Sequence, residues 1–97
     1  MEGAADLIKE ILDREDIEGL LSVGAPPDEY APEAQMLAQR LHGAERSGQD
    51  LQAWVAKEVQ DVWQAAFGPF SRDDLAMREA AFDKVAAGII QAFPQML

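Results

Sequence analysis

The sequence predicts an all-α fold, a compact single-domain bundle of four to five helices that ends in an antiparallel helix hairpin. Apolar residues recur every three to four positions along most of the 97-residue chain, which is the spacing of one helix face. No alternating apolar and polar pattern runs longer than four residues, so no half-buried strand is predicted. A chain of this length, 48% hydrophobic, is typical of one domain with a modest core, here residues 1–97.

The first helix is predicted over about residues 3–14. Its inner face is the apolar set Leu7, Ile8, Ile11 and Leu12. A short second helix is expected over about residues 17–23, with Asp16 as its N-cap and with Leu20 and Leu21 turned inward. Gly24 should end it, because only glycine adopts the left-handed conformation after a helix without strain.

A proline-rich loop follows, and the third helix is expected after it. Pro26 and Pro27 fix the backbone of residues 25–30 and cannot donate hydrogen bonds to a helix or sheet. Pro32 suits the first turn of a helix over about residues 32–44, where Glu33 would lie near the positive end of the helix dipole. The inner stripe of this helix is expected to be Leu37, Ala38 and Leu41.

Two longer helices are predicted to form the hairpin, over about residues 49–67 and 72–93. Residues 47–50 resemble a capping box, Ser71 should cap the last helix, and Gly68-Pro69 should end the preceding one. The short connection favours antiparallel packing. The expected inward residues are Leu51, Val55, Val59, Val62, Ala66, Leu75, Phe82, Val85, Ile89 and Phe93, with Trp54, Trp63 and Phe67 widening the stripe.

The two tryptophans cannot share one face of their helix. Trp54 and Trp63 are nine residues apart, about two and a half turns, so they point in opposite directions. Trp63 is expected in the core. Trp54 either packs beneath the N-terminal loop or stays exposed as an anchor for a partner, a role in which tryptophan is enriched.

Acidic residues are concentrated in the first third of the chain. Residues 1–33 hold ten acids and two bases, a local net charge of −8, out of −10 for the whole chain. Such a concentration attracts basic partners and repels nucleic acid and anionic membranes. Charge patterns are also often only solvated faces that keep a small domain soluble.

The composition argues against most kinds of catalytic or metal-binding site. The chain has no cysteine and a single histidine, His42, so no thiol nucleophile, disulfide or thiolate metal site is expected. No nucleophile elbow, phosphate loop or helical metal-ligand pair is present, and residues 13–24 do not match a calcium-binding loop. We therefore expect no enzyme activity, no cofactor and no metal. The absence of a basic patch, an apolar span and a signal-peptide pattern predicts a cytoplasmic protein that binds neither nucleic acid nor membrane.

One segment resembles a known family. Residues 16–33 read DIEGLLSVGAPPDEYAPE, which resembles the bacterial domain of unknown function 1871 family, whose members carry a similar D-P-x-G-L-L-x-x-G-A-P-x-D-E-Y-D-x-E segment. The specific likeness covers eighteen positions, and the rest agrees only in length and helical layout. Ile17 stands where the family usually has proline, and Ala31 where it usually has an acid. The resemblance implies an all-helical fold and a built loop around Gly24, Pro26, Asp28, Glu29 and Tyr30, but no activity.

The functional expectation is a protein-binding domain. A proline-stiffened loop would display its carboxylates and phenol rigidly; alternatively, Tyr30 packs on the bundle and Asp28 or Glu29 caps the next helix. By analogy with small acidic bacteriocin immunity proteins, the chain is expected to be a monomer or weak dimer that neutralises a basic toxin such as a nuclease. A housekeeping adaptor or regulatory domain is the alternative. The expected partner-binding residues are Asp13, Glu15, Asp16, Glu18, Asp28, Glu29, Tyr30 and Glu33.

Overall fold

The computed structural model describes residues 3–41 and 51–92, and within these ranges the fold is all-helical. The helices are α1 (Gly3–Glu15), α2 (Ala31–Leu41), α3 (Leu51–Phe67) and α4 (Arg72–Ala92). No strand occurs in the described residues. The predicted fold class, including the C-terminal helix hairpin, is confirmed. None of the helices described is both long and apolar enough to cross a membrane.

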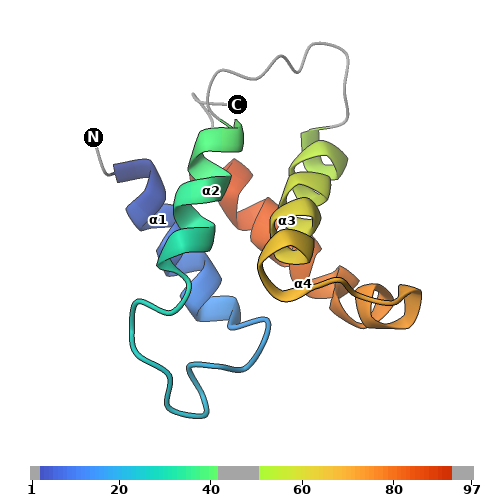
Figure 1. The fold of residues 1–97 in the computed structure, drawn as a ribbon. Helices are drawn as coiled ribbons and strands as arrows, with labels where there is room; N and C mark the ends of the chain where they lie inside the picture. Colours follow the sequence, from blue (N-terminus) through green and yellow to red (C-terminus); the bar gives the residue numbers. More distant parts are fainter. Residues whose placement is uncertain (1–2, 42–50, 93–97) are drawn as a thin grey trace.

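Each helix packs against two others, so that the four surround one core. Helices α3 and α4 form the most extensive pair, α1 lies against α2 and α4, and α2 bridges α1 and α3 (Figure 1). The side chains that fill the centre are apolar and almost fully buried. They are Ile8, Ile11, Leu12, Tyr30, Ala34, Leu37, Leu41, Val55, Val59, Val62, Trp63, Phe82, Val85, Ala86 and Ile89.

The predicted inward faces agree with this core except at their edges. Leu51, Trp54 and Leu75 are partly buried against the core. Two predictions were wrong: Leu7 is 41% exposed, and Ala66 is exposed too. Leu7 lies at the outer edge of the apolar face of α1, while at the end of α3 it is Phe67, next to Ala66, that packs against the core.

Residues 16–30, which we call the acidic loop, form a series of turns. The short helix expected over residues 17–23 is absent, and that prediction was wrong. Asp16 and Gly19 both have positive φ, +43° and +71°, which a right-handed helix cannot accommodate. The left-handed conformation expected at Gly24 is nevertheless confirmed, although it ends a series of turns and not the predicted helix. Gly24 has φ +100°, and the Gly24 and Ala25 amides donate to the Leu21 and Leu20 carbonyls at 3.1 and 3.0 Å, the hydrogen-bond pattern of a helix C-terminus.

The turn between α3 and α4 is built by local hydrogen bonds. A Cβ on Gly68 would lie 2.6 Å from the Gln64 carbonyl oxygen, so only glycine fits there. The Gln64 carboxamide oxygen accepts from the Phe70 amide at 2.9 Å. Ser71 Oγ accepts from the Asp74 amide at 3.1 Å, which confirms Ser71 as the cap of α4. The capping box expected at residues 47–50, the inward Phe93 and His42 lie outside the described residues.

Candidate functional site

The Asp16 carboxylate holds the acidic loop together through hydrogen bonds within the loop. Its Oδ1 accepts hydrogen bonds from the Tyr30 hydroxyl at 2.7 Å and the Leu21 amide at 3.1 Å. Its Oδ2 accepts from the Ser22 amide at 3.1 Å. Desolvation opposes ionisation of Asp16, but these hydrogen bonds outweigh it and hold its pKa below the ordinary value. Asp16 therefore closes the loop from within, instead of starting a helix.

Tyr30 brings the end of the loop into the core. Its side chain is fully buried, with its ring stacked on Trp63 at 5.8 Å and edge-on to Phe67 at 6.3 Å between centroids. Burial, together with the hydrogen bond to the Asp16 carboxylate, raises the pKa of the phenol well above its usual range. Of the two readings of Tyr30, packing on the bundle is the one that the structure bears out.

Glu18 connects the loop to both helices of the hairpin. Its Oε2 accepts from Trp63 Nε1 at 2.8 Å and from Arg78 Nε at 2.7 Å, while Oε1 accepts from Arg78 Nη2 at 2.8 Å. The hydrogen bonds from Arg78, with the one from Trp63, lower the pKa of Glu18 against partial desolvation. Arg78 also donates to the Asp74 carbonyl and lies 4.4 Å from the centre of the Phe70 ring. The two hydrogen bonds from Arg78 to the two carboxylate oxygens of Glu18 form a bidentate pair, which is the strongest geometry for a guanidinium and a carboxylate.

The other predicted residues differ widely in their surroundings. Asp13 pairs with Lys9 at 2.7 Å, and Glu15 with Arg14 at 3.5 Å. Asp28 is exposed and Glu29 is half-buried, both in the turn before α2.

Glu33, in the first turn of α2, is only 8% exposed, and its Oε1 has no hydrogen-bond partner. Burial, with the nearby Glu29 carboxylate, raises the pKa of Glu33.

The eight residues therefore do not form one surface. Asp16, Glu18 and Tyr30 are joined through the loop and through Trp63, whereas Asp28 faces solvent. Sequence reasoning missed Arg78 and the role of Trp63. A buried indole N–H needs an acceptor, and that requirement was the one available signal. Trp63, not Trp54, contacts the loop, because it lies at the loop end of α3; Trp54 is half-buried against the core.

The arrangement joins the acidic loop to α3 and α4 by hydrogen bonds and one ion pair. In the part of the chain that the structure describes, no group of three or more histidine or acidic side chains could hold a metal ion. Comparisons with known proteins found no matching family model, no similar curated protein and no similar solved structure.

Proposed function

We propose that this chain is a small acidic, non-enzymatic domain that binds another protein. In its concrete form it is an immunity or inhibitor protein that neutralises a basic toxin such as a nuclease. The observation that carries the proposal is the net charge of −8 over residues 1–33. Nuclease clefts are positive because they hold phosphates, and an acidic domain is steered toward them at long range.

Not every acid of that region is free to meet a partner. Asp6 and Glu10 on α1 and Asp28 in the acidic loop are exposed, and none of them makes an ion pair or side-chain hydrogen bond within the described residues. Their charges are uncompensated, and these three acids are available for contact. Glu29, which is half-buried beside Asp28, is the fourth acid that we place at the partner-binding surface.

The internal hydrogen bonds support binding indirectly. Asp16, Glu18 and Tyr30 hold the acidic loop against α3 and α4, so the turn that carries Asp28 and Glu29 is fixed before any partner arrives. A surface ordered in advance loses less conformational entropy on binding. In this proposal Asp28 and Glu29 contact the partner, while Asp16, Glu18 and Tyr30 position them.

The alternative is a housekeeping adaptor or regulatory domain whose acidity serves solubility. One observation favours it: several acids of residues 13–33 are engaged inside the molecule, among them Asp13, Asp16 and Glu18. The resemblance to the domain of unknown function 1871 family remains a proposal as well, and it is neutral between the two.

The test begins with capture of partners from the native host, followed by charge reversal. Asp28→Lys with Glu29→Lys should slow association with a captured basic partner at least about tenfold at low salt, because like charges then meet. The matched control is Glu79→Lys with Asp83→Lys, two exposed acids on α4 that change the net charge equally. Equal slowing by both pairs would mean that only net charge matters, and no slowing by the first pair would reject this surface.

A further inference from the structure

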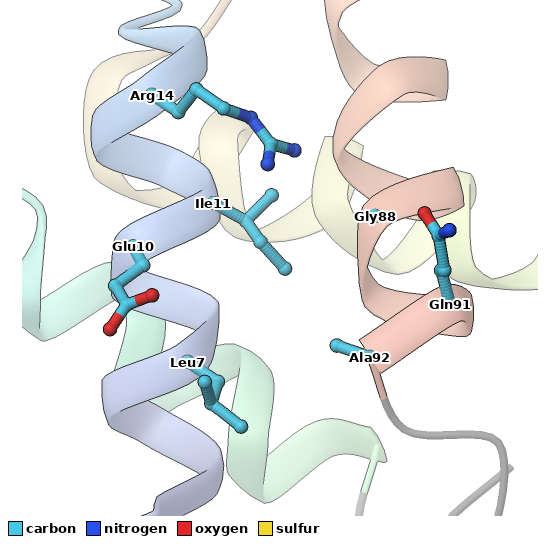
Figure 2. Close-up of a pocket in the computed structure, with 7 residues that line it drawn as sticks. All are labelled: Leu7, Glu10, Ile11, Arg14, Gly88, Gln91 and Ala92. Atoms are coloured by element: carbon cyan, nitrogen blue, oxygen red, sulfur yellow. The ribbon is translucent and has the colours of Figure 1, made fainter.

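A groove with a volume of about 260 Å³ lies between α1 and α4 on the surface of the bundle. Figure 2 shows that its two ends differ. Leu7 and Ala92 lie on opposite walls at one end, and the Arg14 guanidinium points from α1 toward α4 at the other. Ile11 lies between the two ends. Leu7 is 41% exposed, so the groove offers uncovered apolar surface with a cation at one end.

Arg14 is the charged lining residue that faces the groove. Glu10 also lines it, but its carboxylate points to the side of α1 away from α4 (Figure 2). Arg14 Nε lies 3.5 Å from the Glu15 carboxylate, and the Arg14 side chain is 64% exposed. Nη1 and Nη2 donate no hydrogen bond within the residues that the structure describes. These two nitrogens are therefore available to a ligand, and a guanidinium binds a carboxylate through two parallel hydrogen bonds.

Gly88 allows the guanidinium to lie against α4. A Cβ at this position would be 3.2 Å from Arg14 Nη2 and 3.2 Å from Ile11 Cγ2, which is tighter than ordinary packing. A larger residue at 88 would therefore displace both side chains and change the groove. The Gln91 carboxamide ends beside Gly88 on the α4 wall (Figure 2), and it adds N–H donors at the cationic end.

We propose that this groove binds a small apolar monocarboxylate, that is, a carboxylate on a short hydrocarbon chain. The carboxylate accepts hydrogen bonds from Arg14 Nη1 and Nη2, and the chain lies over Ile11 toward Leu7 and Ala92. Small-ligand sites combine such an apolar lining with a few polar groups that fix the orientation of the ligand. The site is independent of the proposed function, because it takes a ligand of the opposite charge at a different part of the surface.

The net charge of the chain favours other occupants over this ligand, which makes the preference of the groove informative. At −10, the chain attracts cations and repels anions at long range. Only a local cation can reverse that order. A groove that prefers an anion to a cation with the same hydrocarbon chain is therefore recognised through Arg14. A basic occupant would place like charge against Arg14, and a second copy would bring two acidic chains together.

The test compares ligands that share a hydrocarbon chain and differ in charge. Octanoate, octylammonium, acetate and a helical peptide of leucine and glutamate are each titrated into the ¹⁵N-labelled full chain at about 150 mM salt, where long-range attraction is screened. We expect octanoate to bind about fivefold more tightly than octylammonium, the upper end for an exposed ion pair. Its amide shifts should be concentrated in residues 7–14 and 88–92. Acetate should bind far more weakly, since each buried methylene contributes up to about fourfold in affinity.

Two variants separate the contribution of charge from that of apolar contact. Arg14→Gln should abolish the preference for octanoate over octylammonium. Leu7→Ser should weaken both ligands alike, by about fourfold, because it removes apolar surface and leaves the charge unchanged. The matched control is Arg72→Gln, an exposed arginine at the other end of α4, which changes the net charge equally and should leave the preference intact. Leu7 and Arg14 are exposed, so both variants should fold, and their amide spectra check this.

Several outcomes would overturn the groove proposal. Equal binding of octanoate and octylammonium would show that only apolar surface is recognised, and equal binding of acetate that only charge is. An unchanged preference in Arg14→Gln would remove the proposed cation. If octanoate does not bind, the ligand is not a small carboxylate: shifts of the same amides with the peptide would assign the groove to an acidic protein segment, and shifts that depend on protein concentration to a second copy. None of these results bears on charge reversal at Asp28 and Glu29, so the proposed function fails separately.

Discussion

The acidic loop and the outer face of α1 carry the same kind of residue and use it in opposite ways. Asp16 and Glu18 accept hydrogen bonds from backbone amides, Tyr30, Trp63 and Arg78. Asp6 and Glu10 on α1 are exposed and accept none within the described residues. The number of acids in a segment therefore does not reveal their role. What decides it is whether a hydrogen-bond donor, from the loop itself or from another element, lies within reach of the carboxylate, and the following predictions test that distinction.

The largest effect is expected at Glu18. Glu18→Ala leaves the Arg78 guanidinium and the Trp63 N–H without their acceptor, and both are largely withdrawn from solvent, with the Glu18 and Arg78 side chains 14% and 20% exposed. Breaking such a pair from one side should lower the free energy of unfolding by about 2–4 kcal/mol. Urea denaturation measures it. Glu10→Ala, the exposed counterpart, should cost less than about 0.5 kcal/mol, and equal losses would contradict the comparison.

A smaller effect is expected at the other end of the loop. Tyr30→Phe keeps the buried ring against Trp63 and removes only the hydroxyl that donates to Asp16 at 2.7 Å. A hydrogen bond to a charged acceptor is worth about 1.5–3 kcal/mol, and the lower end applies because Asp16 keeps two amide donors. A double-mutant cycle with Asp16→Asn isolates this bond. A coupling energy near zero would show that the ring, and not the hydroxyl, holds the loop.

The helical faces could be predicted from the sequence because burial repeats with the helix period. Ile8, Leu12, Val55, Val59, Val62 and Ile89 are all buried as expected. Gly24 and Ser71 were predictable for a local reason, since a left-handed backbone and a helix cap each require few residue types. The same reasoning wrongly predicted Asp16 as the cap of a helix over residues 17–23. It did not foresee that the Asp16 carboxylate would accept hydrogen bonds from the amides of Leu21 and Ser22 in a series of turns.

The candidate site was harder to predict, because the hydrogen bonds of Glu18 join residues that are far apart in the sequence. Glu18 and Arg78 lie 60 positions apart, and nothing in the local sequence distinguishes Glu18 from Glu10 as the acid that meets an arginine. Charge concentration singled out residues 1–33 as a whole. It could not separate the acids that hold the fold from those that face solvent. That difference depends on which donors of α3 and α4 lie next to the loop.

The loss of folding stability at low pH should also depend on the acidic loop. Asp16 and Glu18 have folded-state pKa values below their ordinary ones, so their contribution to stability is complete above the ordinary carboxylate range, about pH 4–5. It is lost as pH falls from that range through the lower folded values. Glu18→Gln cannot titrate, so its unfolding midpoint should fall less steeply below pH 4.5 than that of the parent. Parallel curves would show that Glu18 is not among the groups that titrate with unfolding.

The smallest effect is expected at Glu33, and with the opposite sign. Its pKa is raised by burial and by Glu29, so the folded state holds its proton more tightly than the unfolded chain does. Stability from this group is therefore full below its ordinary pKa and falls as pH rises through that value toward the folded one. Glu33→Gln mimics the protonated form, and it should raise the free energy of unfolding at pH 7 by less than about 1 kcal/mol, seen as a higher unfolding midpoint. The same change at Asp28, Asp28→Asn, should leave the midpoint unaltered, because Asp28 is exposed. If Glu33→Gln lowers the midpoint instead, the Glu33 carboxylate stabilises the start of α2 in its charged form, and it belongs with Asp16 and Glu18 as an internal tie.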